Sequence, residues 1–581
     1  MEIKILSAPA QMTAKFDYQI SQEKLKIVTC SVDFHQKIAP SPVQLRFAIP
    51  ASPVYSHWTP TVYFNRGIRP SWEDPHILSR LGSGAPVVCF IANDHTNLAT
   101  VALSDATSPH KISYGYEEES GEISVTISLF AMPVAPIEQY QVSIRIDTRP
   151  LPFFDTIPAV ETWWAQECGY PPAFVPDAAK RPTDSLWYSY HQNLEVDTII
   201  NECIESKRLG MDTVIIDEGW ETDDGNPGFV ACGDWEPSTA KIPSMPDLVK
   251  RLHEIGMKVM LWFSVPFMGL HSKNFERFQG MLLNNAPTSP LINACCLDPR
   301  YKEVRDFLTE TYAAAVQTYC LDGLKLDFID NFCLYPESMQ DDPARDIYSL
   351  EDGMDALFAQ IMGTLQAINP DIMIEFRQTY IGPHIRRYGN MLRVGDCPGD
   401  PLRNKLGVFD LRLLSGKTAV HSDPITWSKD APVEYAALQL LNVFFSVPQI
   451  SLQLPCMPQD HKTMLQHYLR VWNEHRSTLL DGKLRVYDPE ANYTLATASK
   501  DGELFAIRYE AVPLTIDQPY DRILLLNAKD ERASLIDTHV DLSEKSCSIY
   551  DCMGHLIKEF YLGHDRIIAL PIPVSGMAVI S

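Results

Sequence analysis

In roughly the first 150 residues, hydrophobic and polar positions alternate in short runs, as in residues 24–32 and 123–129. Turn-forming residues separate these runs at intervals of about ten residues, and no long helical period lies between them. This pattern is typical of strands in two packed antiparallel sheets. We therefore predict an N-terminal β-sandwich over residues 1–165, within which a proline-rich stretch begins that runs on into the next region.

After residue 183 the pattern changes to short apolar runs that alternate with amphipathic stretches of helical period. This alternation is the signature of parallel βα units. The eight predicted strands cover residues 186–191, 213–218, 258–265, 323–329, 371–377, 391–396, 418–423 and 450–454. Helical patterns lie between most of them, and the weakest covers residues 402–414. We therefore predict a central (β/α)8 TIM barrel over residues 166–478.

Short alternating runs return from about residue 480, as in residues 504–509 and 522–527, and predict a small C-terminal antiparallel β-domain over residues 479–581. The fold class is thus multidomain, with α/β and all-β parts. Of the 581 residues, 45% are hydrophobic and 21% are charged, which excludes wholesale disorder.

The chain carries 49 basic and 74 acidic side chains, and its formal charge of −25 repels polyanions. We therefore expect no nucleic-acid partner. No apolar run is long enough for a membrane span, and the N-terminal sequence lacks a signal-peptide pattern, so a cytoplasmic protein without a membrane partner is expected. A homo-oligomer stays open, because nothing in the sequence identifies an interface.

Charged and aromatic residues cluster where the predicted barrel strands end, which is where barrel active sites lie. A single aspartate at a strand end is usually a turn residue or a helix cap, but a whole ring of charged strand ends is unusual. Carboxylates beside cations and tryptophans suit carbohydrate hydroxyls and sugar rings, and two carboxylates on different strands are the minimal machinery of glycosidic bond cleavage. The charged and aromatic strand-end residues are Asp217, Glu218, Trp262, Lys325, Asp327, Arg377, Arg393, Asp396 and Asp423.

These residues resemble the motifs of a known clan of retaining α-glycosidases, which contains the α-galactosidases of families 27 and 36. The sequence from Lys325 to Phe328 resembles the clan's K-x-D motif on the fourth strand, and the sequence from Asp217 to Trp220 resembles its D-D-x-W/Y motif. Arg393 followed by Asp396 is similar to its sixth-strand R-x-x-(x)-D motif. The order sandwich, barrel, β-domain favours family 36.

The resemblance implies a retaining, exo-acting α-galactosidase that releases terminal α-linked galactose from an oligosaccharide or glycoside through a covalent intermediate. Asp327 would be the nucleophile. Asp396 would be the general acid and then the base, a task that calls for a raised pKa. The residues implied to bind substrate are Asp217, Glu218, Trp187, Trp262, Lys325, Arg377, Arg393 and Asp423.

Two departures from the family pattern leave alternatives open. Asp396 follows Arg393 by three positions where the family commonly has four, so Asp400 is a second candidate for the acid. Glu218 replaces the second aspartate of the family motif, and its extra methylene reaches about 1.3–1.5 Å further. If Glu218 faces the exocyclic hydroxymethyl group of galactose, a β-L-arabinopyranoside, which lacks that group, would fit better.

Other classes are also consistent with parts of the sequence. A transglycosidase related to raffinose synthases shares the barrel motifs, and a degenerate carbohydrate-binding barrel is disfavoured because both candidate catalytic aspartates are present. A metal-dependent hydrolase could use Asp327, Asp396, His421 and Asp423 as ligands, but no HxH or HExxH motif occurs and Lys325 would repel a cation. We therefore expect neither a metal nor another cofactor. The resemblance to family 36 also makes the N-terminal residues around Trp58 candidates to reach over the barrel mouth.

Overall fold

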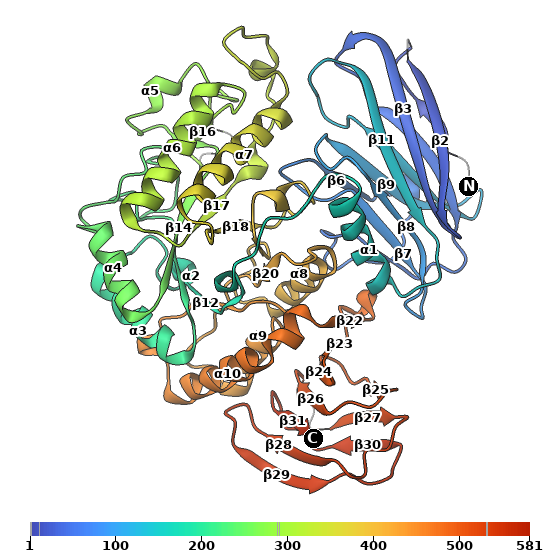
Figure 1. The fold of residues 1–581 in the computed structure, drawn as a ribbon, viewed down its shortest axis with the longest axis vertical. Coiled ribbons are helices and arrows are strands. Elements are labelled where there is room, and N and C mark those ends of the chain that lie inside the picture. Colours follow the sequence, from blue (N-terminus) through green and yellow to red (C-terminus); the bar gives the residue numbers. More distant parts are fainter. Residues whose placement is uncertain (1–2, 11, 288, 290, 530–532) are drawn as a thin grey trace.

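The computed structural model describes residues 3–10, 12–287, 289, 291–529 and 533–581. Three regions follow one another along the chain (Figure 1): a sandwich of two sheets drawn in blue, a barrel drawn in green and yellow, and a pair of sheets drawn in red. The sandwich lies against one side of the barrel, and the C-terminal sheets lie beyond helices α9 (Val433–Leu441) and α10 (Gln459–Asp481).

The N-terminal region is the predicted β-sandwich. Alternate residues of its strands are buried, so that Val43, Leu45 and Phe47 of one sheet share a core with Val28 and Val101 of the other. In sheet order, the strands are β1 (Lys4–Ser7), β4 (Val43–Pro50), β10 (Glu122–Leu129), β9 (His110–Glu117) and β6 (His76–Ser79) in one sheet, and β2 (Thr13–Gln22), β3 (Leu25–Ile38), β11 (Ile137–Asp147), β8 (Asn97–Leu103), β7 (Val87–Ile91) and β5 (Ser56–Trp58) in the other.

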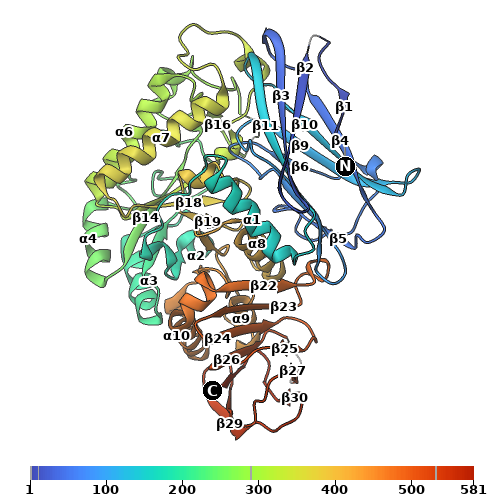
Figure 2. The same cartoon turned by 45° about the vertical axis from the view of Figure 1, so that its right-hand side comes forward.

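A helix that the sequence pattern did not predict, α1 (Phe153–Gln166), follows the last sandwich strand. It lies between the sandwich and helix α8 (Pro401–Leu414) of the barrel (Figure 2). The indole N–H of Trp164 donates a hydrogen bond of 2.7 Å to the carbonyl of Leu103, which ties α1 to strand β8. The helix thereby fixes the sandwich against the barrel.

The central region is an eight-stranded parallel barrel, as predicted. Strand β21 pairs with β12, and Val447 N–H donates to the Val420 carbonyl at 2.8 Å, so the ends of the sheet meet. In chain order, the strands are β12 (Thr183–Ser185), β13 (Thr213–Ile216), β14 (Lys258–Ser264), β17 (Gly323–Asp327), β18 (Met373–Arg377), β19 (Met391–Arg393), β20 (Ala419–His421) and β21 (Gln449–Ile450). Besides α9 and α10, the barrel helices are α2 (Leu186–Tyr190), α3 (Val196–Leu209), α4 (Met245–Ile255), α5 (Phe275–Phe278), α6 (Lys302–Tyr319), α7 (Leu350–Ile368) and α8 (Pro401–Leu414), and a hairpin of β15 (Phe267–Gly269) and β16 (Ala294–Cys296) lies between α4 and α6.

The first and the last strand of the barrel differ from the prediction. Residues 186–191 are not the first strand: the strand ends at Ser185, and helix α2 begins at Leu186. The strand itself is polar, with Asp184 fully buried, so no apolar run marked it, and a short apolar run does not distinguish strand from helix. The last strand covers Gln449–Ile450 rather than 450–454. The weakly patterned helix at 402–414 is present as α8.

The C-terminal region consists of two mainly antiparallel sheets, each with one parallel pair, β24 with β26 and β25 with β27. Ile523, Leu525 and Ile549 lie in the core between the sheets. In sheet order, the strands are β22 (Lys483–Tyr487), β23 (Leu495–Lys500), β24 (Glu503–Arg508), β26 (Arg522–Asn527), β31 (Met577–Ile580), β28 (Ser546–Tyr550) and β29 (Leu556–Tyr561), then β25 (Leu514–Ile516), β27 (Ser534–Thr538) and β30 (Ile567–Leu570).

One buried ion pair joins all three regions. Arg66 of the sandwich donates to both carboxylate oxygens of Asp410 on α8, at 2.9 and 2.7 Å, and both side chains are fully buried. Asp410 also accepts hydrogen bonds from Trp58 Nε1 at 2.9 Å and from the Tyr493 hydroxyl at 2.7 Å. Trp58 is therefore part of this junction and does not reach over the barrel mouth.

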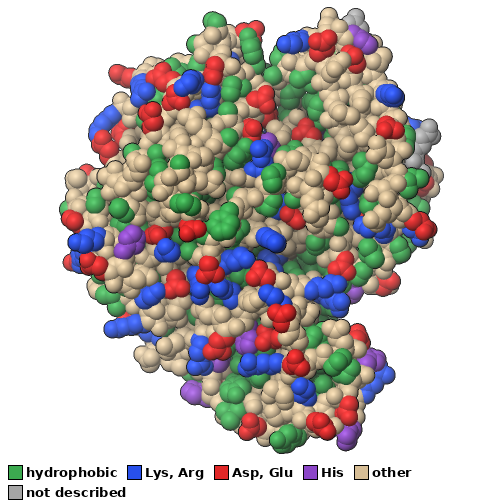
Figure 3. All heavy atoms as spheres, in the orientation of Figure 1, with side chains coloured by type: hydrophobic (Ala, Val, Ile, Leu, Met, Phe, Trp, Pro, Cys, Tyr) green, Lys and Arg blue, Asp and Glu red, His purple; other side chains and the backbone are tan. Residues whose placement is uncertain are grey.

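Two surface properties bear on the choice of partners. Acidic and basic side chains are interspersed on the face shown in Figure 3, without an extended basic patch there. In the described part of the chain, no helix combines the length and the apolar character needed to cross a membrane.

Candidate active site

The carboxyl ends of the barrel strands bring most of the predicted residues to one mouth. Lys325 and Asp327 lie two positions apart on β17, so both point to the same side, while Leu324 and Leu326 pack into the outer core. Lys325 Nζ lies 2.6 Å from Asp217 Oδ2, which follows β13. Burial lowers the pKa of Lys325, but the negative charge of Asp217 outweighs it, so the lysine pKa is raised and the amine stays charged.

The carboxylate of Asp327 is held by four donors. Its Oδ1 accepts hydrogen bonds from Arg377 Nε at 2.5 Å, the Tyr380 hydroxyl at 2.9 Å and the Phe328 backbone N–H at 2.7 Å. Its Oδ2 accepts one from Trp262 Nε1 at 3.2 Å. The donors come from strands β14 and β18 and from the loops that follow β17 and β18, so the barrel framework fixes this group.

The same surroundings keep Asp327 ionised. Burial alone would raise its pKa, but the positive charges of Arg377, Lys325 and Arg393 outweigh burial and hold the pKa well below its usual range. An ionised carboxylate in a water-poor pocket is what a nucleophile of this kind requires.

On the sixth strand, Arg393 holds two carboxylates with one nitrogen. Its Nη1 lies 2.9 Å from Asp396 Oδ1 and 2.6 Å from Asp423 Oδ1. The two aspartates differ in exposure, since the Asp396 side chain is 54% exposed and the Asp423 side chain is 0% exposed. Asp396 is therefore the one that faces the mouth.

The pKa of Asp396 is lowered, whereas its expected role as an acid calls for a raised value. Burial and the charge of Asp327 raise this pKa, but the guanidinium of Arg393 outweighs them. The interaction between the two aspartates is consistent with carboxylates that act as a pair. In the ligand-free state, Asp396 is thus held as an anion by its arginine partner.

The other acidic candidates of this region serve as anchors in the structure. Asp400 caps helix α8, and its side chain accepts a hydrogen bond from Arg403 N–H at 3.0 Å. Asp423 accepts bonds from the Cys397 N–H at 2.8 Å and from the Tyr188 hydroxyl at 3.0 Å, and burial raises its pKa to about 6. Its oxygens are engaged beneath the mouth, so Asp423 supports Arg393 instead of lining an open surface.

Glu218 follows Asp217 directly after the second barrel strand. Its side chain is 6% exposed and accepts a hydrogen bond from Gln192 Nε2 at 3.0 Å. Burial, followed by the charge of Asp217, raises its pKa to about 8, so it is protonated at neutral pH. Gln192 packs closely here, because a Cβ atom at Gly219, whose φ is +103°, would lie 2.6 Å from the Gln192 Cα atom. The protonated Glu218 can thus both donate and accept a hydrogen bond.

The two predicted tryptophans occupy different positions. Trp262 is 1% exposed and stacks on Phe229 with 6.2 Å between ring centroids, so it offers its N–H to Asp327 and little open ring face. Trp187 on α2 is half-buried, and the His191 ring packs edge-on to it at 4.8 Å between centroids. Of the two, Trp187 is the more accessible to a sugar ring.

Several residues near these groups were not predicted from the sequence. Tyr380 and Gln192 lie in loops where no motif or period marks them. One contact between the sandwich and the mouth lies near Trp58, as expected: Gln378 Nε2 donates to the Pro60 carbonyl at 3.1 Å. A second contact was not predicted, in which Arg80 Nη2 donates to the Asp330 carbonyl at 2.5 Å. A domain contact of this kind leaves no local signal in a sequence.

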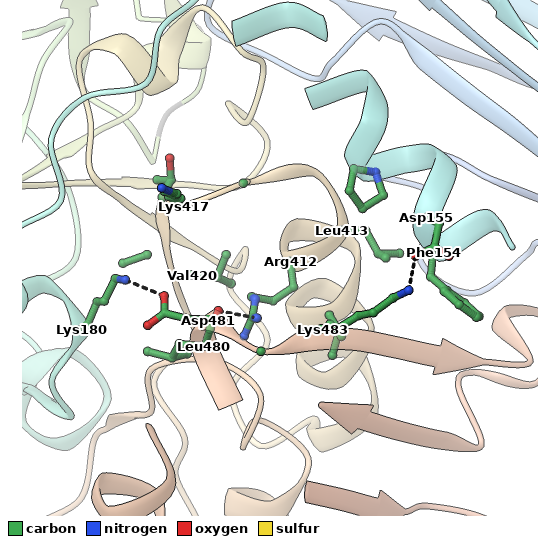
Figure 4. A pocket seen from close by; sticks show the side chains of 16 residues that line it. Phe154, Asp155, Lys180, Arg412, Leu413, Lys417, Val420, Leu480, Asp481 and Lys483 are labelled. Atoms are coloured by element: carbon green, nitrogen blue, oxygen red, sulfur yellow. Dashed lines mark hydrogen bonds and ion pairs between the residues drawn. The ribbon is translucent and has the colours of Figure 1, made fainter. Parts of the chain in front are cut away.

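A separate pocket of about 350 Å³ lies near the N-terminal ends of the barrel strands, between α1, α8 and the start of β22. Figure 4 shows that ion pairs bridge it, with Lys180 2.9 Å from Asp481 and Lys483 3.5 Å from Asp155. It contains none of the predicted site residues. Within the described ranges, no group of three or more His, Cys, Asp or Glu side chains is arranged to hold a metal ion.

Comparisons with known proteins agree with this picture of the barrel. The Melibiase family model matches residues 184–378. The chain is 27% identical over 146 residues to the bifunctional α-galactosidase/sucrose kinase AgaSK of Mediterraneibacter gnavus, covering 24% of this chain and 15% of AgaSK. It is 24% identical over 203 residues to the α-galactosidase Mel36A of Lactobacillus acidophilus, covering 33% of this chain and 26% of Mel36A.

Solved structures share the whole architecture. The α-galactosidase from Lactobacillus brevis superposes with a TM-score of 0.66 at 13% identity, covering 98% of this chain and 80% of that chain. The GH36 α-galactosidase AgaA from Geobacillus stearothermophilus superposes with a TM-score of 0.65 at 14% identity, covering 98% and 81%. The fold class is therefore that of the GH36 α-galactosidases, which are glycoside hydrolases. The expected resemblance is confirmed: this chain is GH36-like, and residues 184–378 of its barrel match the Melibiase family model.

Proposed function

We propose that this protein is a retaining, exo-acting α-galactosidase that cleaves terminal α-linked galactose from oligosaccharides or glycosides. The observation that carries the proposal is the ionised Asp327, held among three cations, whose charge interacts with that of Asp396. Variants of the neighbour AgaA have been solved in complex with stachyose and with raffinose, which supports an oligosaccharide as the substrate class.

The reaction would proceed by double displacement. Asp327 attacks the anomeric carbon and forms a covalent bond to the sugar, while Asp396 gives its proton to the departing glycosidic oxygen. Water then attacks the intermediate, and Asp396 takes up the water proton. A bound sugar covers Asp396 and removes its water, which raises its pKa towards the value that proton donation needs.

The remaining groups would hold the sugar. Lys325 and Asp217 form a charged pair that can donate to and accept from neighbouring hydroxyls, and the protonated Glu218 adds a neutral donor and acceptor. Arg393, fixed from below by Asp423, keeps Asp396 in place. Trp187 offers a ring face at the edge of the mouth.

Two variants test the roles of the carboxylates on aryl α-galactosides. Asp327→Ala should abolish turnover of every aryl galactoside, whatever its leaving group. Asp396→Ala should slow substrates with poor leaving groups by about 10²–10⁴-fold and spare those with good ones, which need little protonation. Asp400→Ala is the matched control and should retain activity, because Asp400 caps α8. Equal losses on both substrates in Asp396→Ala would refute its role as the acid.

A second candidate is a β-L-arabinopyranosidase, and the position of Glu218 favours it. This longer acid is buried and bonded to Gln192, which supports a fixed carboxyl group, and a pentopyranoside without a hydroxymethyl group would need less room beside it. Rates on p-nitrophenyl α-D-galactopyranoside and p-nitrophenyl β-L-arabinopyranoside separate the two functions. A preference for the arabinoside that Glu218→Asp reverses would establish the second function. A galactoside preference in the wild type would establish the first.

A further inference from the structure

The two oxygens of the Asp327 carboxylate are not equivalent. Oδ1 accepts three hydrogen bonds, from Arg377, Tyr380 and the Phe328 N–H, at 2.5, 2.9 and 2.7 Å. Among the described residues, Oδ2 accepts one hydrogen bond, the longer 3.2 Å contact from Trp262. A carboxylate oxygen has about two lone-pair sites, so Oδ1 is fully occupied while Oδ2 keeps one free.

Tyr380 contributes to this asymmetry from a fixed position. Its side chain is fully buried, and its ring packs edge-on against Phe376 with 5.8 Å between centroids. Burial, with the nearby charge of Asp327, raises the pKa of Tyr380 well above its usual value, so its hydroxyl stays protonated and donates. The group is therefore a permanent donor to Oδ1.

The loop that carries Tyr380 is anchored in the N-terminal sandwich. The Gly84 N–H donates to the Thr379 carbonyl at 2.6 Å, and the hydroxyls of Ser83 and Thr379 lie 3.3 Å apart. Gly84 has a φ of +67°, and a Cβ atom there would lie 2.2 Å from the Leu78 carbonyl oxygen. Only glycine fits this backbone conformation so close to Leu78. The sandwich thus helps to hold the loop through Ser83 and Gly84.

We propose that Tyr380 is a positioning residue that fixes Asp327 through Oδ1 and leaves Oδ2 as the attacking oxygen. The inference rests on the proposed retaining function. In the first step, Oδ2 forms the bond to the anomeric carbon. The bond between that carbon and the aglycone oxygen breaks, its electron pair stays on that oxygen, and the proton comes from Asp396.

The first test uses the wild-type protein. An activated difluorogalactoside traps the glycosyl-enzyme, because the fluorines slow its hydrolysis, and a crystal structure of the adduct identifies the bonded oxygen. We expect the sugar on Oδ2, with the Tyr380 and Arg377 bonds to Oδ1 intact. A sugar bonded to Oδ1, with those donors displaced, overturns the inference while the retaining function stands. Absence of any label on Asp327 overturns the function and the inference with it.

The second test removes one oxygen from the side chain. Tyr380→Phe should lower the rate of covalent labelling and kcat by about tenfold or more, as expected for the loss of a hydrogen bond to a charged group. The KM and the inhibition constant of free galactose should change little, because Tyr380 touches the nucleophile and not the sugar. Tyr388→Phe is the matched control, since the Tyr388 hydroxyl bonds to Asp355 in the same region and not to Asp327.

The outcomes separate positioning from general support of the fold. Slower labelling by Tyr380→Phe, with unchanged galactose binding and a wild-type rate in Tyr388→Phe, supports the inference. Labelling as fast as wild type overturns it, and so does an equal loss of galactose binding and labelling. If Tyr380→Phe does not fold, the identity of the bonded oxygen in the wild-type adduct decides.

Discussion

Replacement of Glu218 by glutamine should stabilise the protein, and the gain should depend on pH. The unfolded chain ionises this carboxyl above its ordinary pKa of 4.5, whereas the folded protein keeps it protonated up to a pKa of about 8. Between these values the folded state holds a proton that the unfolded state has released. Stability therefore falls as the pH rises through this window.

The magnitude follows from the difference between the two pKa values. Each unit corresponds to about 1.36 kcal/mol, so the penalty at pH 7 is about 3 kcal/mol, and above pH 8 it reaches about 5 kcal/mol. A glutamine has the same shape, does not ionise and still accepts the hydrogen bond from Gln192. Glu218→Gln should thus be about 3 kcal/mol more stable at pH 7 and close to wild type at pH 4.

Urea unfolding of both proteins at pH 4, 7 and 8.5 measures this difference, because the titrations of all other groups cancel between them. Glu310→Gln, at an exposed position on helix α6, is the matched control and should show no pH-dependent gain. A difference in unfolding free energy that stays constant with pH would refute the reasoning. Glu218→Gln should also lose activity. Such a loss would show that the buried acid lowers the stability of the protein but is needed for its function.

Two further predictions concern the acid and the domain junction. In the proposed mechanism Asp396 acts in its protonated form, and Arg393 lowers its pKa, so kcat/KM on a substrate with a poor leaving group should be highest in acid and fall as the pH rises; an alkaline optimum would contradict this. Asp410→Ala should lower the free energy of unfolding by about 3–5 kcal/mol, since it leaves Arg66 buried without a counter-charge. Urea unfolding of Asp410→Ala and of the Arg66→Met/Asp410→Ala double variant tests this, and the double variant should recover part of the loss.

The sequence predicted the fold where a hydrophobic period marks it, and strand-end residues that it singled out lie together at one mouth of the barrel. The period of two on β17 places Lys325 and Asp327 on one side, and the structure has them so. Strand β12 was not predicted, because its buried residues Thr183 and Asp184 are polar. The apolar run that follows it, which the prediction took as the strand, forms helix α2. Local pattern fails where burial is decided by neighbours distant in the chain.

Protonation states depend on such distant neighbours even more. Asp396 and Asp423 contact the same guanidinium, yet Arg393 lowers the pKa of Asp396 while burial raises the pKa of Asp423. Asp217 and Glu218 are adjacent in sequence, and only the first lies against Lys325. No spacing rule distinguishes the members of either pair, because the difference is set by how much water and which charge each oxygen meets.

The sandwich also contributes to the candidate active site. Asp327 is kept ionised by Arg377, Lys325 and Arg393, which all lie on strands of the barrel. Its orientation depends also on Tyr380, and the sandwich holds the loop of that residue through Gly84. Arg80 of the sandwich likewise fixes the loop after β17 through the Asp330 carbonyl. The barrel therefore keeps Asp327 ionised, and in the proposed mechanism the packing of the sandwich against the barrel helps determine which oxygen of Asp327 faces the substrate.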